Sequence, residues 1–380
     1  MFTESDVVPR KIQQRKLLVA ACLGLWTGLL AFGLWPFNFD PRNRVQWLPN
    51  RGIRLENYGE AYSRLRWNRN DSTESSAGFT VELWARSREK NYHQVSGLLS
   101  IADSLPESFS IAQSGPDVLL RGQFQDAAHK VALRRLYIDD GFQQTQPRFI
   151  TVTSGLQGTE LYLDGVSKRR APVSLTKNNF SGRLLLGHDF AGHQPWAGDL
   201  LGVAIYDRAL TGAEVSEDYS AWQRTNAAEL MKRPGVAALY LFDERAGDVI
   251  HNKAGDAPDI TIPQRFSVLH KTFLGFPPDL HRANLDLSDI AINIVGFVPF
   301  GFFLCAYLRW GKPTGAGRAI LRTVILGALT SLTIELLQAY LPSRESSLLD
   351  VIDNTLGTLV GAILQCGVGI LVSRARRPAV

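Results

Sequence analysis

The sequence predicts a membrane protein of mixed fold class, in which an α-helical bundle of four transmembrane helices is combined with an all-β jelly-roll sandwich. Four apolar runs are long enough to cross a bilayer as helices. The segment between the first and second runs shows short alternating patterns and turn residues, which indicate β-strands. The 41 Lys and Arg and 36 Asp and Glu leave a net charge of only +5. This excess does not favour nucleic-acid binding, because the basic residues gather beside the apolar runs, as in membrane proteins.

The first apolar run, residues 17–35, contains no charged residue and follows four basic ones. It is long for the apolar part of a signal peptide, and no small-x-small cleavage motif follows it. We therefore predict an uncleaved anchor, with residues 1–39 forming a cytoplasmic tail and the first transmembrane helix. Trp35 and Phe37 suit the aromatic belt at a membrane surface.

Three further apolar runs lie near the C-terminus, at residues 288–308, 319–341 and 351–372. Basic residues without acidic neighbours follow the second and fourth runs, whereas acidic residues outnumber the single Arg between the third and fourth. The positive-inside rule then places both termini in the cytoplasm and residues 36–287 outside. All three cysteines fall within predicted spans, so we expect no disulfide. The sequence thus predicts a multi-pass protein of the bacterial inner (cytoplasmic) membrane with an extracytoplasmic jelly roll.

Residues 50–266 are predicted to form the sandwich. Strand patterns occur at residues 79–87, 149–153, 160–163, 183–187 and 198–206. The second and third of these read as a hairpin, and Asp164-Gly165 is a further turn signal. A short helix is expected after Thr211, because Glu214 three residues later completes a capping box. Many short strands with little helix are typical of a sandwich or jelly roll.

Three segments of this region carry a resemblance to a known family. They are Phe79-Thr-Val-Glu-Leu-Trp84, Leu161-Tyr-Leu-Asp-Gly165 and Trp196-Ala-Gly-Asp-Leu-Leu-Gly-Val-Ala-Ile-Tyr-Asp-Arg-Ala-Leu210. They resemble the laminin-G-like, concanavalin A-like jelly roll. Residues 239–247 and 252–255 resemble a strand-and-loop element that usually precedes such a jelly roll rather than following it. The resemblance implies binding of glycans or proteins, sometimes through calcium, and hydrolase activity in some members.

The aromatic and acidic residues of the sandwich give weak site predictions. Trp84 and Trp196 are the glycan-binding candidates, with packing in the core or at an edge as the alternative. Glu82 alternates with apolar neighbours, so we expect it on a solvated face. No compact acid pair on one strand announces a glycosidase.

For metal binding, the sequence of the sandwich leaves calcium as an alternative but predicts no defined site. The candidate carboxylates are Asp103, Asp189 and Asp199, but no loop shows a recognisable calcium-ligand pattern. His188 and His193 are interpreted as loop histidines rather than zinc ligands. We predict no metal site and no cofactor from these residues.

Polar residues in the apolar runs give the sharper site prediction. Glu335 and Gln338 are three residues apart and therefore share one helix face inside a predicted span. A carboxylate at that depth is costly unless something pairs with it. With the predicted helix directions, further polar residues in or beside the C-terminal spans fall at the same, outer side. They are Asp289, Asn293, Asp350, Asp353 and Asn354, together with Arg344 in the outer loop between the third and fourth spans. We predict a polar site in the outer leaflet, or alternatively a set of hydrogen bonds that only cross-links helices, with Glu335 paired to Arg344 or Asn354.

Small residues and a proline are expected to shape this site. Gly357 and Gly361 are four residues apart on the fourth span and Gly327 lies on the third, a pattern that lets helices approach closely in lipid. Pro299 interrupts the second span and frees a backbone carbonyl that is predicted to face the same cavity.

These motifs carry a second resemblance. Residues 289–301, Glu335-Leu-Leu-Gln338, Arg344 and residues 350–357 resemble the VanZ-like membrane family, and Pro36-Phe-Asn-Phe39 is similar to its opening motif. The matching motif positions are Asn293, Pro299, Phe300, Gly301, Glu335, Gln338, Arg344, Asp353, Asn354 and Gly357. The resemblance implies an integral membrane protein, with residues 288–373 as the VanZ-like region. The namesake of the family is linked to teicoplanin resistance, but the long insertion between the first and second spans departs from the compact form of the family.

Three functions follow from these predictions. The first is a cell-envelope protein that binds a glycan or envelope ligand through the jelly roll and a polar head group, such as that of a lipid-linked sugar, in the membrane site. The second is an enzyme on a lipid-linked envelope glycan, with Glu335 or Asp353 as general acid or base. The third is a scaffold of a polysaccharide-export or sorting complex. Expected partners are membrane lipid, a glycan or lipid-linked sugar, or an envelope protein complex, and not nucleic acid.

Overall fold

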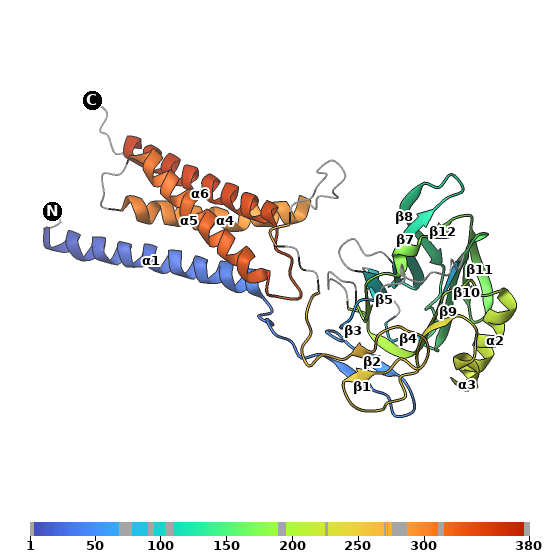
Figure 1. Ribbon diagram of the computed structural model, residues 1–380. Helices are drawn as coiled ribbons and strands as arrows, with labels where there is room; N and C mark the ends of the chain where they lie inside the picture. Colours follow the sequence, from blue (N-terminus) through green and yellow to red (C-terminus); the bar gives the residue numbers. More distant parts are fainter. Residues whose placement is uncertain are drawn as a thin grey trace. The chain divides into compact units, whose positions relative to one another are not determined.

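The computed structural model describes residues 4–67, 78–89, 95–102, 109–188, 195–224, 227–269, 271, 273–275, 287–310 and 315–375. The chain divides into two compact units. One unit comprises Asp40–His270, and the other joins Met1–Phe39 to Lys271–Val380 (Figure 1). The first unit is the β-sandwich and the second is the helix bundle.

The sandwich consists of two antiparallel sheets, in agreement with the predicted jelly roll. The first sheet has the order β1 (Val45–Trp47), β2 (Ile53–Leu55), β14 (Gly198–Tyr206), β4 (Gly78–Ser87), β9 (Arg148–Gly155), β10 (Gly158–Leu163) and β11 (Val166–Ala171), with β15 (Val236–Tyr240) paired to β14. The second has the order β12 (Ser174–Leu175), β7 (Asp117–Gln125), β6 (Phe109–Ser114), β5 (Val95–Ala102), β13 (Arg183–Leu186), β3 (Ala61–Ser63), β17 (Ile260–Thr261) and β16 (Val249–Ile250), with β8 (Val131–Ile138) on β7.

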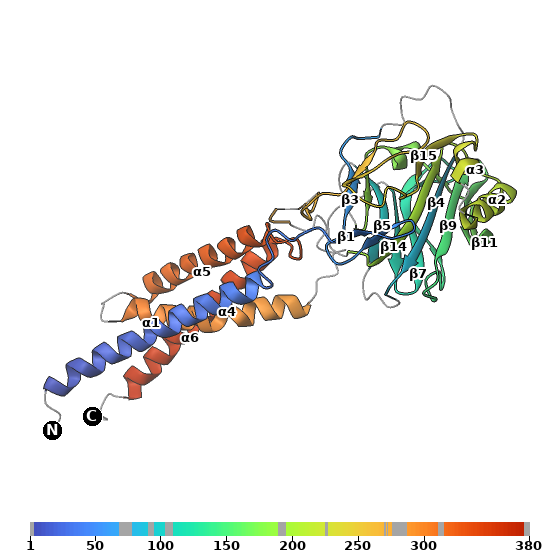
Figure 2. The same cartoon turned by 90° about the horizontal axis from the view of Figure 1, so that it is seen from below.

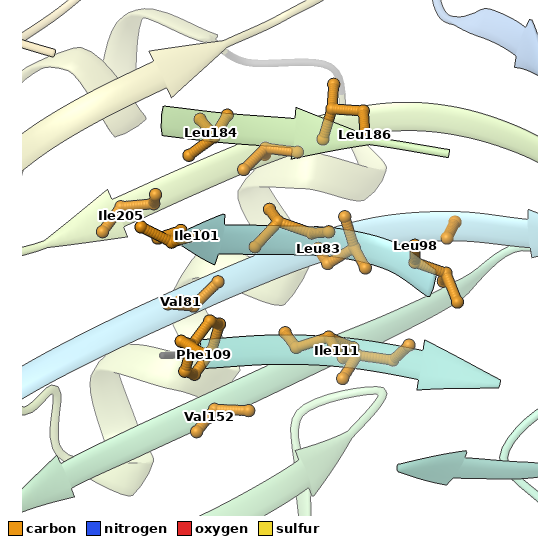
Figure 3. Close-up of a cluster of buried hydrophobic side chains, with 14 of the residues drawn as sticks. Val81, Leu83, Leu98, Ile101, Phe109, Ile111, Val152, Leu184, Leu186 and Ile205 are labelled. Carbon is orange, nitrogen blue, oxygen red and sulfur yellow. The ribbon is translucent and has the colours of Figure 1, made fainter. Parts of the chain in front are cut away.

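The core of the sandwich lies between the inner faces of the two sheets. Side chains from β4, β9 and β14 point toward side chains from β5, β6 and β13 (Figure 3). The alternating strand patterns in the sequence supply these inward residues. Burying each of the larger ones contributes about 1.5–3 kcal/mol to the stability of the fold.

Local signals in the sandwich are confirmed. The predicted hairpin is β9 and β10, which are joined through Leu156 and Gln157. The turn from β10 to β11 uses Asp164 and Gly165, both with positive φ, as a tight hairpin turn requires. Helix α2 (Gly212–Gln223) begins with the predicted capping box, in which the Thr211 hydroxyl accepts the Glu214 N–H and the Glu214 carboxylate accepts the Thr211 N–H.

The strand-and-loop element at residues 239–255 packs into the first sheet. Its strand β15 is antiparallel to β14. The loop that follows is held by Asn252, whose Oδ1 accepts the Leu239 N–H at 2.9 Å and whose Nδ2 donates to the Ala257 carbonyl at 2.9 Å. Although the element follows the jelly roll in sequence, it completes the sheet.

The bundle contains the four predicted transmembrane helices. They are α1 (Glu4–Leu34), α4 (Leu287–Arg309), α5 (Ala316–Gln338) and α6 (Leu348–Ala375). All four are long and apolar enough to cross a membrane, which indicates a multi-pass membrane protein. Helix α1 lies along α4 and α5, and α6 packs against α4 and α5 (Figure 2).

Glycines allow α4 and α6 to pack backbone against backbone. A Cβ added at Gly361 would overlap the Val298 carbonyl oxygen, and one at Gly357 would overlap that of Ile294. Gly327 of α5 lies equally close to the Thr358 side chain of α6. The predicted small-residue contacts are thus present. At the other end of these helices, Cys305 and Cys366 are both free, with their sulfur atoms 4.0 Å apart.

Candidate functional site

A cavity of about 580 Å³ lies within the helix bundle, at the end where α1 and α5 stop and α4 and α6 begin. All four helices and the α5–α6 loop line it. Seven of the eight polar residues predicted for the membrane site are on its wall: Asp289, Asn293, Glu335, Gln338, Arg344, Asp350 and Asn354. The eighth, Asp353, is largely buried on α6 but is not part of the lining. The structure therefore brings together residues that are up to 65 positions apart in sequence, from 289 to 354.

Glu335 occupies the last turn of α5 and is only 2% exposed. Its Oε2 accepts the backbone N–H of Ser347 at 2.7 Å, which ties α5 to the start of α6. The predicted pairings of Glu335 with Arg344 or Asn354 do not form within the part of the chain that the structure describes. The carboxyl group thus contributes to the cavity wall rather than to an ion pair.

Gln338 and Arg344 connect the end of α1 to the cavity. The Gln338 side-chain amide donates to the Gly33 carbonyl at 2.8 Å, and Arg344 Nε donates to the Trp35 carbonyl at 3.2 Å. A Cβ at Gly33 would lie 2.7 Å from the Ile334 side chain, so a larger residue there would push α1 away from α5. These contacts make α1 a wall of the cavity.

Asn354 lines the cavity and has a buried acceptor without a partner in the described part of the chain. Its side chain is 5% exposed, and its Nδ2 donates to Ser331 Oγ at 2.9 Å. Its Oδ1 is buried and accepts no hydrogen bond from any described residue. A buried amide oxygen without a donor destabilises a protein by about 1–3 kcal/mol, so a hydrogen-bond donor placed at this atom would stabilise the bundle.

The charged groups on the cavity wall are mainly acidic. Asp289, Glu335 and Asp350 contribute carboxyl groups, and Arg344 is the one basic residue among the lining residues. The nearby carboxyl groups of Asp353 and Glu345 also repel a negative charge on Asp350. The lining from α1 consists of glycines and apolar residues, namely Gly24, Leu25, Gly28, Leu29, Phe32 and Gly33.

Lys271 supports the site and was not predicted from the sequence. Its Nζ donates to the Gln338 carbonyl at 3.0 Å and to the Leu341 carbonyl, at the C-terminal end of α5, where a positive charge is favourable. Burial lowers the pKa of Lys271 to about 8, against the opposing effect of Glu345. No sequence pattern links a lysine to a helix end that lies 67 residues away.

One predicted contribution to the cavity is absent. Neither Pro299 nor Val295, whose carbonyl loses its helical partner at the proline, is among the lining residues. The Val295 side chain is instead 66% exposed.

The two tryptophans proposed for glycan binding lie in different environments. Trp196 is fully buried, and its Nε1 donates to Gln113 Oε1 at 2.8 Å. Its ring is therefore a core residue with no face available to a sugar, which corrects that part of the prediction. Trp84 is half-buried and packs against Phe149 and Tyr219.

The prediction that Glu82 lies on a solvated face is wrong. Helix α2 covers this side of β4, and Glu82 is fully buried, with its Oε2 3.1 Å from Trp222 Nε1 and 3.4 Å from the Tyr206 hydroxyl. The same hydroxyl lies 3.1 Å from Asp218, which Arg233 also contacts. Burial, followed by the negative charge of Asp218, raises the pKa of Glu82 well above its usual value. An acid pair therefore exists, but it is closed under α2 and lines no cavity described for this chain.

The structure offers no calcium or zinc ligand set among the residues it describes. Asp199 is fully buried and contacts Arg54 at 2.7 Å and Arg86. Its pKa is below the usual value because the hydrogen bonds from the two arginines outweigh burial, which alone would raise it. His188 is also buried, with Nε2 2.7 Å from the Glu60 carboxylate. Asp103, Asp189 and His193 lie outside the described residues.

A basic surface extends along two edge strands of the sandwich, and it was not predicted from the sequence. Strands β8 and β11 end their respective sheets and lie close to each other. Their exposed basic residues, called here the basic edge, are Arg134, Arg135, Lys168, Arg169 and Arg170. Arg134 pairs with Asp126 and Arg170 with Glu160, whereas the other three have no ion-pair partner among the described residues. The runs Arg134-Arg135 and Lys168-Arg169-Arg170 are visible in the sequence, but only the pairing of the strands brings them together.

Comparison with known families agrees with both resemblances. The VanZ/LLP1 family model matches residues 239–371, and a model of the concanavalin A-like lectin/glucanases superfamily matches residues 59–216. The chain therefore contains a VanZ/LLP1 domain and a concanavalin A-like domain. Helix α1 lies outside the first match, although it forms one wall of the cavity. A search of curated proteins found no match.

Solved structures with similarity to this chain include toxin binding domains. The botulinum neurotoxin serotype D ligand binding domain in complex with N-acetylneuraminic acid has 16% identity and a TM-score of 0.35, over 48% of this chain and 45% of that one. The binding domain of Paraclostridial Mosquitocidal Protein 1 has 17% identity and a TM-score of 0.30, over 48% and 47%. The match thus spans less than half of either structure, and at these TM-scores it carries no argument about ligand.

Proposed function

We propose that this chain, which combines a VanZ/LLP1 domain with a concanavalin A-like domain, is a bacterial cell-envelope protein that binds an amphipathic ligand in its membrane cavity and a glycan on its jelly roll. The observation that carries the proposal is the cavity itself. It gathers seven polar residues at one end of four transmembrane helices, and it contains a buried acceptor that no described residue satisfies. Ionisable groups within membrane segments are costly and tend to mark functional sites.

The shape of the cavity supports an amphipathic ligand. The polar residues lie at the end of the bundle, where a lipid head group resides in a bilayer, and the α1 wall is apolar. A head group can therefore contact Glu335 and Asn354 while an attached chain follows Leu25, Leu29 and Phe32. We place this end of the bundle, together with the jelly roll, on the extracytoplasmic side, because basic residues flank the opposite helix ends.

The test is retention of ligand by the purified protein. Lipids extracted from the purified protein are identified by mass spectrometry and compared among the parent, Glu335→Gln and Asn354→Leu. We expect the bound lipid to fall by about tenfold in both variants, since each loses contacts to the ligand. Asp353→Asn is the matched control, because Asp353 is a buried acid of the same bundle that does not line the cavity. Equal lipid in the parent and both cavity variants would show that the cavity is not the binding site.

The alternative hypothesis, that the protein is an enzyme, places the reaction in the same cavity. A measurement of substrate turnover distinguishes it from binding alone. Glu335 is positioned to exchange a proton with a bound head group, whereas Asp353 does not reach the cavity wall. Incubation of the parent with lipid-linked oligosaccharides distinguishes binding from catalysis. Conversion that disappears in Glu335→Gln would favour the enzyme, and binding without conversion would favour the proposal above.

The basic edge favours an acidic glycan as the partner of the jelly roll. Three of its five basic side chains have no ion-pair partner among the described residues, and they extend over two neighbouring strands. Charged side chains on edge strands also prevent sheet-to-sheet aggregation, so binding must be tested directly. The full-length protein in nanodiscs is applied to immobilised acidic and neutral polysaccharides at salt concentrations from about 50 to 300 mM. Over this range, salt strongly reduces the attraction between exposed charges.

The expected result is retention on the acidic polysaccharide that weakens as salt rises. The double variant Arg135→Glu/Arg169→Glu should abolish retention. Arg183→Glu, at an exposed arginine on β13, is the control for a local charge reversal. If the double variant is retained like the parent, the basic edge serves only to protect the sheet edges.

A further inference from the structure

The cavity wall also indicates which head group it accepts. Three carboxyl groups, from Asp289, Glu335 and Asp350, and the single guanidinium of Arg344 contact the same cavity. A purely anionic head group would meet one favourable and three unfavourable groups. A purely cationic head group would leave Arg344 without an anionic partner.

The unpartnered oxygen of Asn354 adds a requirement that charge alone does not impose. Because Oδ1 is a buried acceptor, a ligand satisfies it only by donating an N–H or O–H. A primary ammonium group carries three such donors, whereas a quaternary ammonium carries none. The donor requirement therefore separates two head groups of equal charge.

The apolar wall requires a chain attached to the head group. Leu25, Leu29 and Phe32 of α1 and Ile292 and Phe297 of α4 form the apolar part of the lining. Leu25 and Leu29 also pack against the cluster that contains Phe297. Gly24 and Gly28 are four residues apart, and a Cβ at either would meet no atom within 4 Å. The wall is therefore open at these two glycines, which leaves room there for a hydrocarbon chain.

We propose that the cavity holds the head group of a zwitterionic phospholipid with a primary amine, of the phosphoethanolamine type. The ammonium donates to Asn354 Oδ1 and is held by the carboxylates of Glu335 and Asp350. The phosphodiester faces Arg344, whose guanidinium suits a phosphate, and the acyl chain follows the α1 wall. This inference rests on the proposed binding of an amphipathic ligand and specifies its head group.

The experiment compares three lipids that share the same acyl chains. The full-length protein, stripped of lipid in detergent, is titrated with dioleoyl phosphatidylethanolamine, phosphatidylcholine and phosphatidylglycerol, and binding is read by native mass spectrometry. We expect the ethanolamine lipid to bind at least about tenfold more tightly than either of the others, since each lacks a charge-assisted hydrogen bond that it makes. Equal or tighter binding of the choline or glycerol lipid would overturn the inference.

Variants locate the selectivity in the named residues. Asn354→Leu should remove the preference for ethanolamine over choline, and Asp350→Asn gives a second test should the first variant not fold. Arg344→Gln should weaken the ethanolamine and choline lipids alike. Thr333→Val, at an exposed residue of α5 that does not line the cavity, should behave as the parent. A preference for ethanolamine that survives in the folded Asn354 and Asp350 variants would show that other residues select the head group.

A competition experiment with a soluble compound distinguishes binding of a lipid from binding of a free head group. Glycerophosphoethanolamine has the same amine and phosphate without acyl chains, and we expect it to compete with the lipid at least about 100-fold more weakly, since the apolar wall is then empty. Competition at equal concentration would rule out a lipid as the ligand.

The two proposals also predict different outcomes when they are wrong. Lipid binding that depends on Glu335 but shows no preference for the amine contradicts only the head-group inference, whereas the absence of Glu335-dependent lipid contradicts the proposed function.

Discussion

The sandwich and the helix bundle treat their buried polar side chains in opposite ways. In the sandwich, Glu60 contacts His188 and the Ser267 N–H, and Asp199 contacts two arginines. In the bundle, Glu335 accepts one backbone hydrogen bond, and Asn354 Oδ1 accepts none from the described residues; both line a cavity. The difference teaches that burial of a polar group is not by itself a sign of function. The sandwich uses such groups to hold strands and loops together, whereas in the bundle they line a cavity with fewer hydrogen-bond partners among the described residues.

Replacement of Trp196 should have the largest effect. Because its ring is fully buried between the sheets, Trp196→Ala should lower the free energy of unfolding by about 3–5 kcal/mol. Chemical unfolding of the detergent-solubilised protein, followed by near-UV circular dichroism, measures this loss. Trp84→Ala, at the half-buried position, is the control and should lose less. A stable Trp196→Ala protein that fails to bind glycan would contradict the assignment of this residue to the core.

Matched acid substitutions test the comparison between the two regions directly. Glu60→Ala leaves a buried imidazole and an amide without their acceptor, and should reduce stability by about 3 kcal/mol. Glu335→Ala should reduce it by about 1 kcal/mol or less, since water can enter a polar cavity and replace the lost acceptor of the Ser347 N–H. The same unfolding assay reads both. A larger loss from Glu335→Ala would mean that the acid of the bundle is structural, like that of the sandwich.

Glycine substitutions test how tightly the bundle holds its cavity. Gly361→Leu forces a side chain against the Val298 carbonyl, and should destabilise the α4–α6 contact by about 1–3 kcal/mol. Gly367→Leu is a matched control on the same helix, because a Cβ there meets no atom within 4 Å. Thermal unfolding followed by far-UV circular dichroism of the solubilised protein distinguishes the two. Equal unfolding temperatures would contradict the close packing of α4 and α6.

The smallest expected effect concerns pH and the buried Glu82. Because its pKa is raised in the folded state, the native protein retains a proton that the unfolded chain releases above the ordinary value of 4.5. The stability of the sandwich should therefore fall as pH rises from that value toward neutrality. Glu82→Gln stays neutral and keeps an oxygen near Trp222, so it should flatten this dependence and raise the unfolding temperature at pH 7. An unchanged pH profile in the variant would show that Glu82 is ionised in the folded protein.

The sequence predicted the bundle site better than the polar groups of the sandwich, for a physical reason. A long apolar helix has a known direction and a period of 3.6 residues, so Glu335 and Gln338 could be assigned to one face and one depth. The strand pattern around Glu82 specifies a face but not what covers it. That face is buried because α2, more than 100 residues later in the chain, packs on it.

Other parts of the site could not be predicted because they depend on contacts between distant segments. Lys271 meets the end of α5 only in the folded bundle, and the hydrogen bond from Asn354 Nδ2 to Ser331 joins two different helices. The contribution of α1 had no reliable signal either: Gly24 and Gly28 have the same spacing as Gly357 and Gly361, but only the second pair makes close helix contacts. The clustering of basic residues on β8 and β11 needed the strand order of both sheets.

The division of the cavity wall between α1 and the three C-terminal helices has a consequence for biogenesis. Residues 35–286 are synthesised after the first wall and before the others. The nascent chain must therefore retain α1 in the bilayer while the entire sandwich is made, and a chain that stops before α6 lacks Asp350 and Asn354. Only a chain synthesised through α6 therefore contains every wall of the cavity.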